Sequence, residues 1–259
     1  TLRIMAGATK IVLHLTMGNK GGRYELAKVK EYQGHRKKEE GLQERVSALR
    51  AFMEEYETPT VNSLASYEQE ADDALCQAMV AARDGGWENE AVLWSLDKDL
   101  WMVGGLHMNP KTYALEEFPW GYGSCRLDDS TSSKKVVGRG TSFFWHQLLM
   151  GDTADGIPGL PAFSKGITTM LFPTKKKLQA EERLRKANTP TKARAAHVAL
   201  DKVYDAIKPK KCGPVAVHTY LATCNTDKAA FTAVLRAYRE HYGNGTVEAT
   251  DWQGNAYRT

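Results

Sequence analysis

The pattern of hydrophobic and polar residues changes character about half way along the chain. In the first half, short apolar runs predict buried strands at 10–16 (KIVLHLT), 58–64 (TPTVNSL) and 90–96 (EAVLWSL). Apolar residues at helical spacing predict helices over 41–57 and over 67–86, where a Gly pair ends the pattern. Strands that alternate with helices in this way indicate an α/β sheet.

The second half is expected to be almost wholly helical. Residues 104–140 are rich in Gly, Pro, Ser and aromatic residues, which is typical of hairpins and loops, and 141–150 predicts a short capped helix. The Gly-rich tail fits either a hairpin or a frayed end. We therefore expect a sheet domain over 1–150 and a helical region over 151–259. Its predicted helices run over 164–172, 175–187, 190–208, 214–224 and 226–242.

The net charge of +4 conceals an uneven distribution along the chain of 259 residues. Residues 164–211 carry 13 basic and four acidic side chains, so this segment is +9 and the remainder is −5. Such a basic segment either holds a polyanion or is an ordinary solvated helical face, and charge alone does not choose between them.

The sequence contains no run of about 18 apolar residues, so we expect no membrane span and no membrane partner. Four scattered cysteines without ligand spacing argue against a zinc site and favour reduced thiols in a cytoplasm.

Seven acidic residues stand at the edges of predicted elements, in three clusters. Each cluster has an ordinary explanation, because acids favour the positive end of a helix dipole and also cap or solvate turns. The second cluster, however, follows a buried strand, where alternate residues point to one side and where open α/β sheets gather their ligands. The clusters are Glu70, Asp72 and Asp73; Asp97 and Asp99; and Asp152 and Asp155.

Convergence of these clusters would crowd the carboxylates into a small volume. Their repulsion raises pKa values and costs stability unless cations lie between them. Oxygen ligands select hard cations such as Mg²⁺ or Mn²⁺, and two such ions can generate a hydroxide and stabilise the leaving oxygen of a phosphodiester. Because a basic helical region follows, the sequence favours a metal site that acts on nucleic acid.

Four motifs, in order, resemble those of the 5′-nucleases, the flap endonucleases and 5′→3′ exonucleases, especially of the bacteriophage type. EADDAL resembles the Glu-x-Asp-Asp motif, SLDKDL the Asp-x-Asp that follows a strand, and MGDTADGIPGLP the Gly-Asp-x-x-Asp-x-Ile-x-Gly signature. The stretch 22–38 is similar to the family's basic segment that ends in Tyr-Lys-x-x-Arg. The resemblance covers roughly residues 10–170 and implies a PIN-like, mostly parallel sheet flanked by helices, followed by a helix–three-turn–helix DNA-binding element.

The resemblance also implies roles for the acidic and basic residues. Glu70 and Asp72 would hold one Mg²⁺ or Mn²⁺ ion, Asp97, Asp99 and Asp152 a second, and Asp73 and Asp155 would act directly or through water. Arg23 and Arg36 would contact phosphates near the scissile bond, and a K⁺ ion would accompany the turn at Gly156 and Gly159. The residues expected to contact nucleic acid are Tyr32, His35, Lys37, Lys38, Gly156, Gly159, Lys165, Lys175, Lys176 and Lys177.

The activity implied is divalent-metal-dependent hydrolysis of duplex, flap or 5′-end DNA, or of RNA–DNA hybrids, by a cytoplasmic monomer of a bacterium or a phage-infected cell. The sequence departs from the family pattern in three places. Residues 1–10 contain no aspartate, Thr16 and Met17 stand where a strand-ending Asp is expected, and Gln33 replaces a Lys. These departures keep open a nuclease-like DNA-binding protein without catalysis. A third hypothesis is a PIN-type ribonuclease, but the helical half after residue 150 favours binding of duplex DNA instead.

Overall fold

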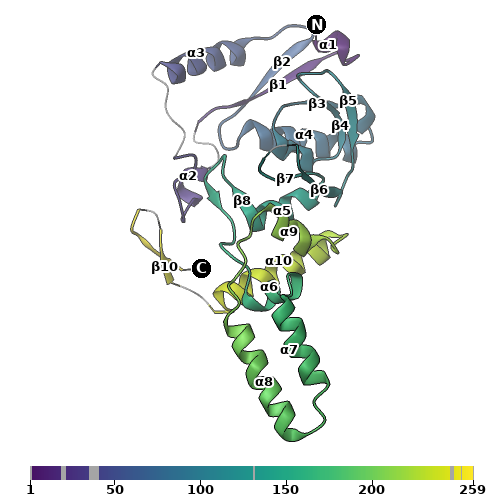
Figure 1. Cartoon of the computed structure of the whole chain (residues 1–259). Helices are drawn as coiled ribbons and strands as arrows, with labels where there is room; N and C mark the ends of the chain where they lie inside the picture. Colours follow the sequence, from purple (N-terminus) through teal and green to yellow (C-terminus); the bar gives the residue numbers. More distant parts are fainter. Residues whose placement is uncertain are drawn as a thin grey trace.

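The computed structural model describes residues 2–18, 22–34, 41–130, 132–245, 248–251 and 253–258. The chain has a mixed α/β body, from which a long helical hairpin protrudes (Figure 1). None of the helices within these ranges combines the length and the apolar character that crossing a bilayer requires.

The first part of the body is built on a parallel pair of strands, β1 (Ile11–Thr16) and β2 (Val61–Ser66). Their register runs from Ile11 opposite Val61 to Thr16 opposite Ser66, so both strands end at the same edge. Helix α3 (Leu42–Glu55) lies in the connection between them, and α4 (Ala71–Asp84) begins just after β2 and contacts both strands. The short helices α1 (Leu2–Met5) and α2 (Arg23–Leu26) flank β1 in sequence.

A second sheet joins β3 in parallel to β4, and β4 in antiparallel to β5. An antiparallel hairpin, β6 with β7, follows it. Met79 of α4 packs with Leu93 of β3 and with Leu100, so the same helix covers both sheets. The elements are η2 (Glu88–Glu90), β3 (Val92–Trp94), η3 (Lys98–Met102), β4 (Gly105–Met108), β5 (Leu115–Phe118), β6 (Ser124–Asp128) and β7 (Lys135–Arg139).

The mixed α/β class is as expected, but the single mostly parallel sheet is not what forms. Among the described residues the strands divide into small separate sheets, of which only β1–β2 and β3–β4 are parallel pairs. Strand β3 is also shorter than the predicted 90–96. The Ser95 hydroxyl accepts from Asp97 N at 3.0 Å and the Asp97 carboxylate accepts from Asp99 N at 2.9 Å. These local bonds compete with strand pairing and turn the chain into η3.

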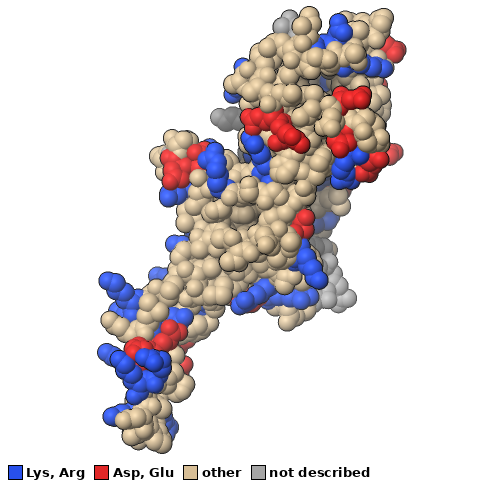
Figure 2. All heavy atoms as spheres, turned by 90° about the vertical axis from the view of Figure 1, so that its right-hand side faces the viewer, with Lys and Arg blue, Asp and Glu red and all other residues tan. Residues whose placement is uncertain are grey.

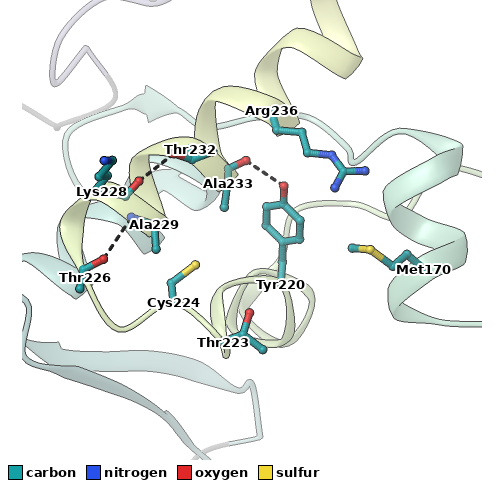
Figure 3. A pocket seen from close by; sticks show the side chains of 10 residues that line it. All are labelled: Met170, Tyr220, Thr223, Cys224, Thr226, Lys228, Ala229, Thr232, Ala233 and Arg236. Carbon is teal, nitrogen blue, oxygen red and sulfur yellow. Dashed lines mark hydrogen bonds between the residues drawn. The ribbon is translucent and has the colours of Figure 1, made fainter.

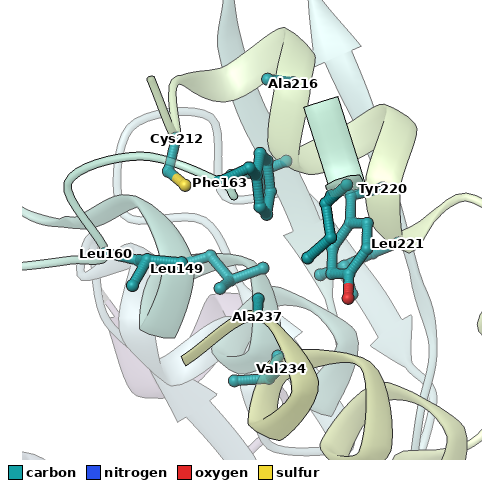
Figure 4. Packing of buried hydrophobic residues seen from close by; sticks show 11 residues of the cluster. Leu149, Leu160, Phe163, Cys212, Ala216, Tyr220, Leu221, Val234 and Ala237 are labelled. Atoms are coloured by element: carbon teal, nitrogen blue, oxygen red, sulfur yellow. The ribbon is translucent and has the colours of Figure 1, made fainter. Parts of the chain in front are cut away.

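The second half is helical, as the pattern predicts. Its hydrophobic core gathers residues from α5, the segment after it, α6, α9 and α10, and includes Leu149, Phe163, Ile167 and Val217, all fully buried (Figure 4). The helices are α5 (Thr141–Met150), α6 (Lys165–Leu171), α7 (Lys175–Arg185), α8 (Pro190–Asp205), α9 (Pro214–Leu221) and α10 (Asp227–Tyr242). This core fixes α5 and the loop that follows it relative to the rest of the helical half.

Helices α7 and α8 pack against each other and form the protruding hairpin (Figure 1). Figure 2 shows lysine and arginine side chains along this hairpin, and acidic side chains gathered on the body above it. The C-terminal tail forms an antiparallel hairpin of β10 (Glu248–Thr250) with β11 (Ala256–Arg258), which decides between the two expectations for the tail. The basic segment of the sequence therefore forms the α6–α8 part of the structure, including the protruding hairpin.

Candidate metal and nucleic-acid site

The first acidic cluster stands at the N-terminus of α4. Glu70 is the N-cap and is 8% exposed; its side chain accepts from the Asp73 amide, and the Asp73 side chain accepts from the Glu70 amide. This reciprocal arrangement satisfies two amides that the first turn of a helix leaves unpaired. Thr16, at the end of β1, accepts from Ala71 N at 2.8 Å through its hydroxyl. The strand end therefore meets the helix start at the cluster.

Arg23 of α2 binds this cluster. Its Nη1 lies 2.5 Å from Glu70 Oε2, and its Nη2 lies 2.7 and 2.9 Å from the two oxygens of Asp73. Partial burial opposes the charge of the guanidinium, but Tyr32, Glu70 and Asp73 together raise the pKa of Arg23 above its ordinary value. The guanidinium expected to meet a phosphate is thus held by carboxylates in this structure.

Tyr32 and Gln33 connect the first cluster to the third. The Tyr32 hydroxyl lies 3.4 Å from Glu70 Oε1 and 3.3 Å from Asp155 Oδ2, and Gln33 Nε2 donates to Asp155 Oδ1 at 3.0 Å. Gln33 also donates its amide to the Asp155 carbonyl at 2.9 Å, from a backbone with φ of 55°. Burial, with the charges of Asp155 and Glu70, raises the pKa of Tyr32 to about 12, so this phenol stays protonated. Residues 32–33 and the turn at 155 are therefore fastened together.

The second cluster lies at the start of η3. Asp97 is the N-cap of this 3₁₀ helix, and Lys98 and Asp99 follow it. Lys98 Nζ lies 2.8 Å from Asp99 Oδ1 and 2.7 Å from Asp152 Oδ2. Gln147 of α5 donates to the same two carboxylates, at 2.8 Å to Asp99 and 3.1 Å to Asp152. Two acids that are 53 positions apart in sequence thus share both a cation and an amide donor.

Asp152 lies in a hairpin that follows α5, formed by β8 (Gly151–Asp152) and β9 (Ile157–Pro158). Its Oδ1 accepts from Ala154 N at 2.7 Å. Burial works against ionisation of this carboxyl, but Lys98 and the Ala154 amide outweigh it and hold the pKa of Asp152 below its ordinary value. Asp152 is thus ionised at neutral pH and held in one orientation.

Asp72 is the acid of the first cluster that is influenced by the charge of the second cluster, through Asp97. Burial, then the charges of Asp97, Glu70 and Asp73, raises its pKa to about 6, against a weaker opposing effect of Arg23. Contacts therefore join the first cluster to the third through Tyr32 and the third cluster to the second through Lys98, and the charge of Asp97 in the second cluster influences Asp72 in the first. The fold brings all seven predicted acids to one region.

The chemistry of this region fits hard cations only in part. The donors are carboxylate oxygens, which suit Mg²⁺ or Mn²⁺, and the bridging ammonium of Lys98 shows that Asp99 and Asp152 converge on a single positive charge. Within the described ranges, however, no group of three or more His, Cys, Asp or Glu side chains is arranged to hold a metal ion. Arg23 and Lys98 contact these carboxylates instead.

Apart from Tyr32, the predicted nucleic-acid contacts that the structure describes lie in the hairpin after α5, in α6 and in α7. Gly156 has φ of 75°, a backbone that favours glycine, and Gly159 approaches Gly151 closely in the hairpin after α5. Lys165 Nζ donates to the Asp205 carbonyl at 3.0 Å, so it fastens α6 to the end of α8. Lys177 pairs with Glu181, whereas Lys175 and Lys176 are exposed at the start of α7. His35, Arg36, Lys37 and Lys38 lie outside the described residues.

A pocket of about 590 Å³ lies elsewhere, beside α6, α9 and α10 (Figure 3). It is lined in part by Tyr220, Lys228 and Arg236, and none of the seven acids contributes to it. Tyr220 donates from its hydroxyl to the Ala233 carbonyl at 2.8 Å, and Arg236 pairs with Glu240, so two of its polar groups are already engaged. The acidic region is therefore separate from this pocket.

Comparisons with known proteins give one structural likeness. The T5 D15 protein, in a crystal structure with metal ions, superposes with a TM-score of 0.44 and 14% sequence identity, over 92% of this chain and 88% of that one. No family model matches the chain, and no curated protein matches it.

Two residues of the site were not anticipated from the sequence. Lys98 stands between two of the predicted ligands in SLDKDL, and a lysine so placed could have been read as their counter-ion. Gln147 gave no signal, because it lies within an apolar helix and reaches the acids only through the way α5 packs.

Proposed function

We propose that this chain is a divalent-metal-dependent nuclease of the 5′-nuclease type, which hydrolyses phosphodiester bonds in DNA at its 5′ ends or flaps. The observation that carries the proposal is the meeting of Asp99 and Asp152 around one positive charge, supported by the charges that Asp97, Glu70 and Asp73 place around Asp72. Carboxylates so crowded are costly for a protein that has no use for cations.

In this proposal Glu70 and Asp72 hold one Mg²⁺ or Mn²⁺ ion, and Asp97, Asp99 and Asp152 hold the second. Ions held by these residues would supply a hydroxide nucleophile at neutral pH and would stabilise the leaving oxygen. Asp73 and Asp155 support these ligands, because each is fixed by partners that already connect the clusters: Arg23 for Asp73, and Tyr32 with Gln33 for Asp155.

Substrate binding is assigned to the basic hairpin and to the turn at Gly156 and Gly159. Lys175 and Lys176 would bind duplex phosphates without reading sequence, so affinity should fall steeply with salt. The K⁺ ion that the family resemblance implies would belong to this turn. Arg23 and Arg36 would contact substrate phosphates near the scissile bond. Arg23 would first have to release a carboxylate that it binds in this structure, Glu70 or Asp73.

Cleavage of 5′-labelled duplex and flap DNA with Mn²⁺, Mg²⁺ or EDTA tests the proposal. Asp152→Asn keeps the shape of the side chain but removes its charge, and we expect it to reduce the Mn²⁺-dependent cleavage rate at least about 100-fold, since even supporting residues of metal sites matter 10- to 100-fold. Asp129→Asn is the matched control, because Asp129 is exposed and its contact with Lys134 is long, at 4.0 Å. Equal rates for Asp152→Asn and the parent would contradict the proposal.

A second candidate is a nuclease-like protein that binds DNA and does not cleave it. Thr16 favours it, because a hydroxyl that caps α4 occupies the strand end where the family places an aspartate. Salt-sensitive binding to flap DNA, with no cleavage in either Mn²⁺ or Mg²⁺, would support this candidate against the first.

A further inference from the structure

Lys98 occupies a central position among the acids. Its side chain comes from η3, between two predicted ligands, and its ammonium lies within 2.8 Å of one oxygen on Asp99 and one on Asp152. The same ammonium lies 5.6 Å from the centre of the Phe143 ring, so a third group also faces the charge. Charge-assisted bonds of this length are about twice as strong as those between neutral groups.

We propose that Lys98 is the built-in counter-ion of this site, which a divalent ion must displace before Asp99 and Asp152 can bind it. The inference rests on the proposed function, and it adds a residue that sets the affinity for metal. Lys98 is thus a positioning residue: it holds the two carboxylates together around its own ammonium.

The geometry makes the two cations mutually exclusive. Asp152 Oδ1 is engaged with Ala154 N, so Oδ2, the oxygen that Lys98 contacts, is the one directed to the shared position. A divalent ion between Asp99 and Asp152 would stand close to the ammonium, and like charges at that separation repel. Lys98 must therefore turn away.

The surroundings allow this displacement. The Lys98 side chain is 45% exposed, whereas that of Asp152 is 11% exposed, so the lysine can turn to solvent while the carboxylate stays in place. Gln147 remains beside both acids and keeps them together after the lysine leaves. Binding of a divalent ion thus costs the two Lys98 contacts but not the arrangement of the ligands.

Arg23 is, like Lys98, a basic residue that binds two of the predicted acids, but it does so in the first cluster. Its guanidinium binds Glu70 and Asp73 at the same time, from a side chain that is 35% exposed. Because that pair belongs to the capping box of α4, its removal would disturb a helix as well as a charge. Lys98 caps no helix, so it is the position where the counter-ion can be removed cleanly.

Mn²⁺ binding to the full chain, without nucleic acid, tests the inference by the electron paramagnetic resonance signal of free Mn²⁺. Lys98→Met keeps the length of the side chain and removes the ammonium. We expect the variant to bind Mn²⁺ roughly tenfold more tightly than the parent, since hydrogen bonds to charged groups no longer have to be broken. Lys98→Arg should stay near the parent value, and so should Lys134→Met, which removes an exposed lysine from another loop.

A second measurement separates the counter-ion role from a change in folding. In EDTA, Lys98→Met should unfold at a lower temperature than the parent, because Asp99 and Asp152 then repel each other, and saturating Mn²⁺ should remove the difference. Unchanged or weaker Mn²⁺ binding by a folded Lys98→Met, with the parent binding normally, would overturn the inference and leave the metal site intact. No Mn²⁺ binding by either protein would overturn both the inference and the metal-dependent function.

Discussion

At the scale of single residues, the pKa of a carboxyl group in this protein depends on which charged groups surround it. Asp72 and Asp152 are both aspartates near the ends of structural elements, yet the pKa of Asp72 is raised to about 6 and that of Asp152 is lowered. Both are partly buried, and burial disfavours the charge of each. The difference is that Asp152 has Lys98 as a direct partner, whereas acids dominate around Asp72.

Replacement of Asp72 by Asn tests this difference. A raised pKa means that the folded state holds the proton more tightly than the unfolded state, so stability falls as the pH rises from about 4 to about 6. Without metal, Asp72→Asn should therefore melt higher than the parent at pH 8, by roughly 2–4 °C after allowing for solvent screening, and match it near pH 4. Thermal unfolding in EDTA across this range measures the effect, and a variant that is less stable at pH 8 would contradict it.

At the scale of elements, the hairpin after α5 depends on a close approach of two glycines. A Cβ on Gly159 would lie 2.2 Å from Gly151 N and 2.4 Å from the Leu149 carbonyl oxygen, and both are backbone atoms that cannot move aside. Gly151 itself has φ of 77°. This approach lets the hairpin fold back on the end of α5, and so it places Asp152 beside Lys98 and Gln147.

Gly159→Ala should therefore disturb both the fold and the site. We expect a loss of about 1–3 kcal/mol in the free energy of unfolding, the usual cost of forcing an extra carbon into packed structure. Denaturant unfolding measures the loss, and Gly245→Ala is the control, because no atom of the described residues lies within 4 Å of its added Cβ. If both variants unfolded at the same denaturant concentration, the close approach would not matter.

At the scale of the whole molecule, basic side chains line the protruding hairpin of α7 and α8 (Figure 2). Lys175, Lys176 and Lys177 occupy the first turn of α7, where the positive end of the helix dipole disfavours cations. A helix that served only for stability would carry acids there. The placement therefore favours a polyanion partner over a merely solvated face, and it is the structural argument for DNA along the hairpin.

Replacement of Lys175, Lys176 and Arg183 by Gln should weaken duplex binding without destabilising the fold. For each phosphate contact that is lost, the slope of log affinity against log salt should fall by about 0.9, so by up to about 2.7 for three contacts. Fluorescence anisotropy at several salt concentrations measures the slope. The triple substitution of Lys111, Lys134 and Lys135 by Gln removes the same charge from the body of the molecule, away from α7, and an equal fall there would refute a role for the hairpin.

The sequence by itself determined most of the elements and their order, because the hydrophobic patterns of helices and strands repeat over a few residues and are therefore local. It also predicted that acids would stand at the edges of these elements, as Glu70 at the start of α4 and Asp97 after β3 illustrate. Only the tertiary structure decided which acids meet and what lies between them. The contacts that Lys98 and Gln147 make with Asp152 depend on how α5 and the hairpin after it pack against η3. The division into small sheets depends on which strands pair. These are contacts between residues far apart in the sequence, and a local hydrophobic pattern carries no information about them.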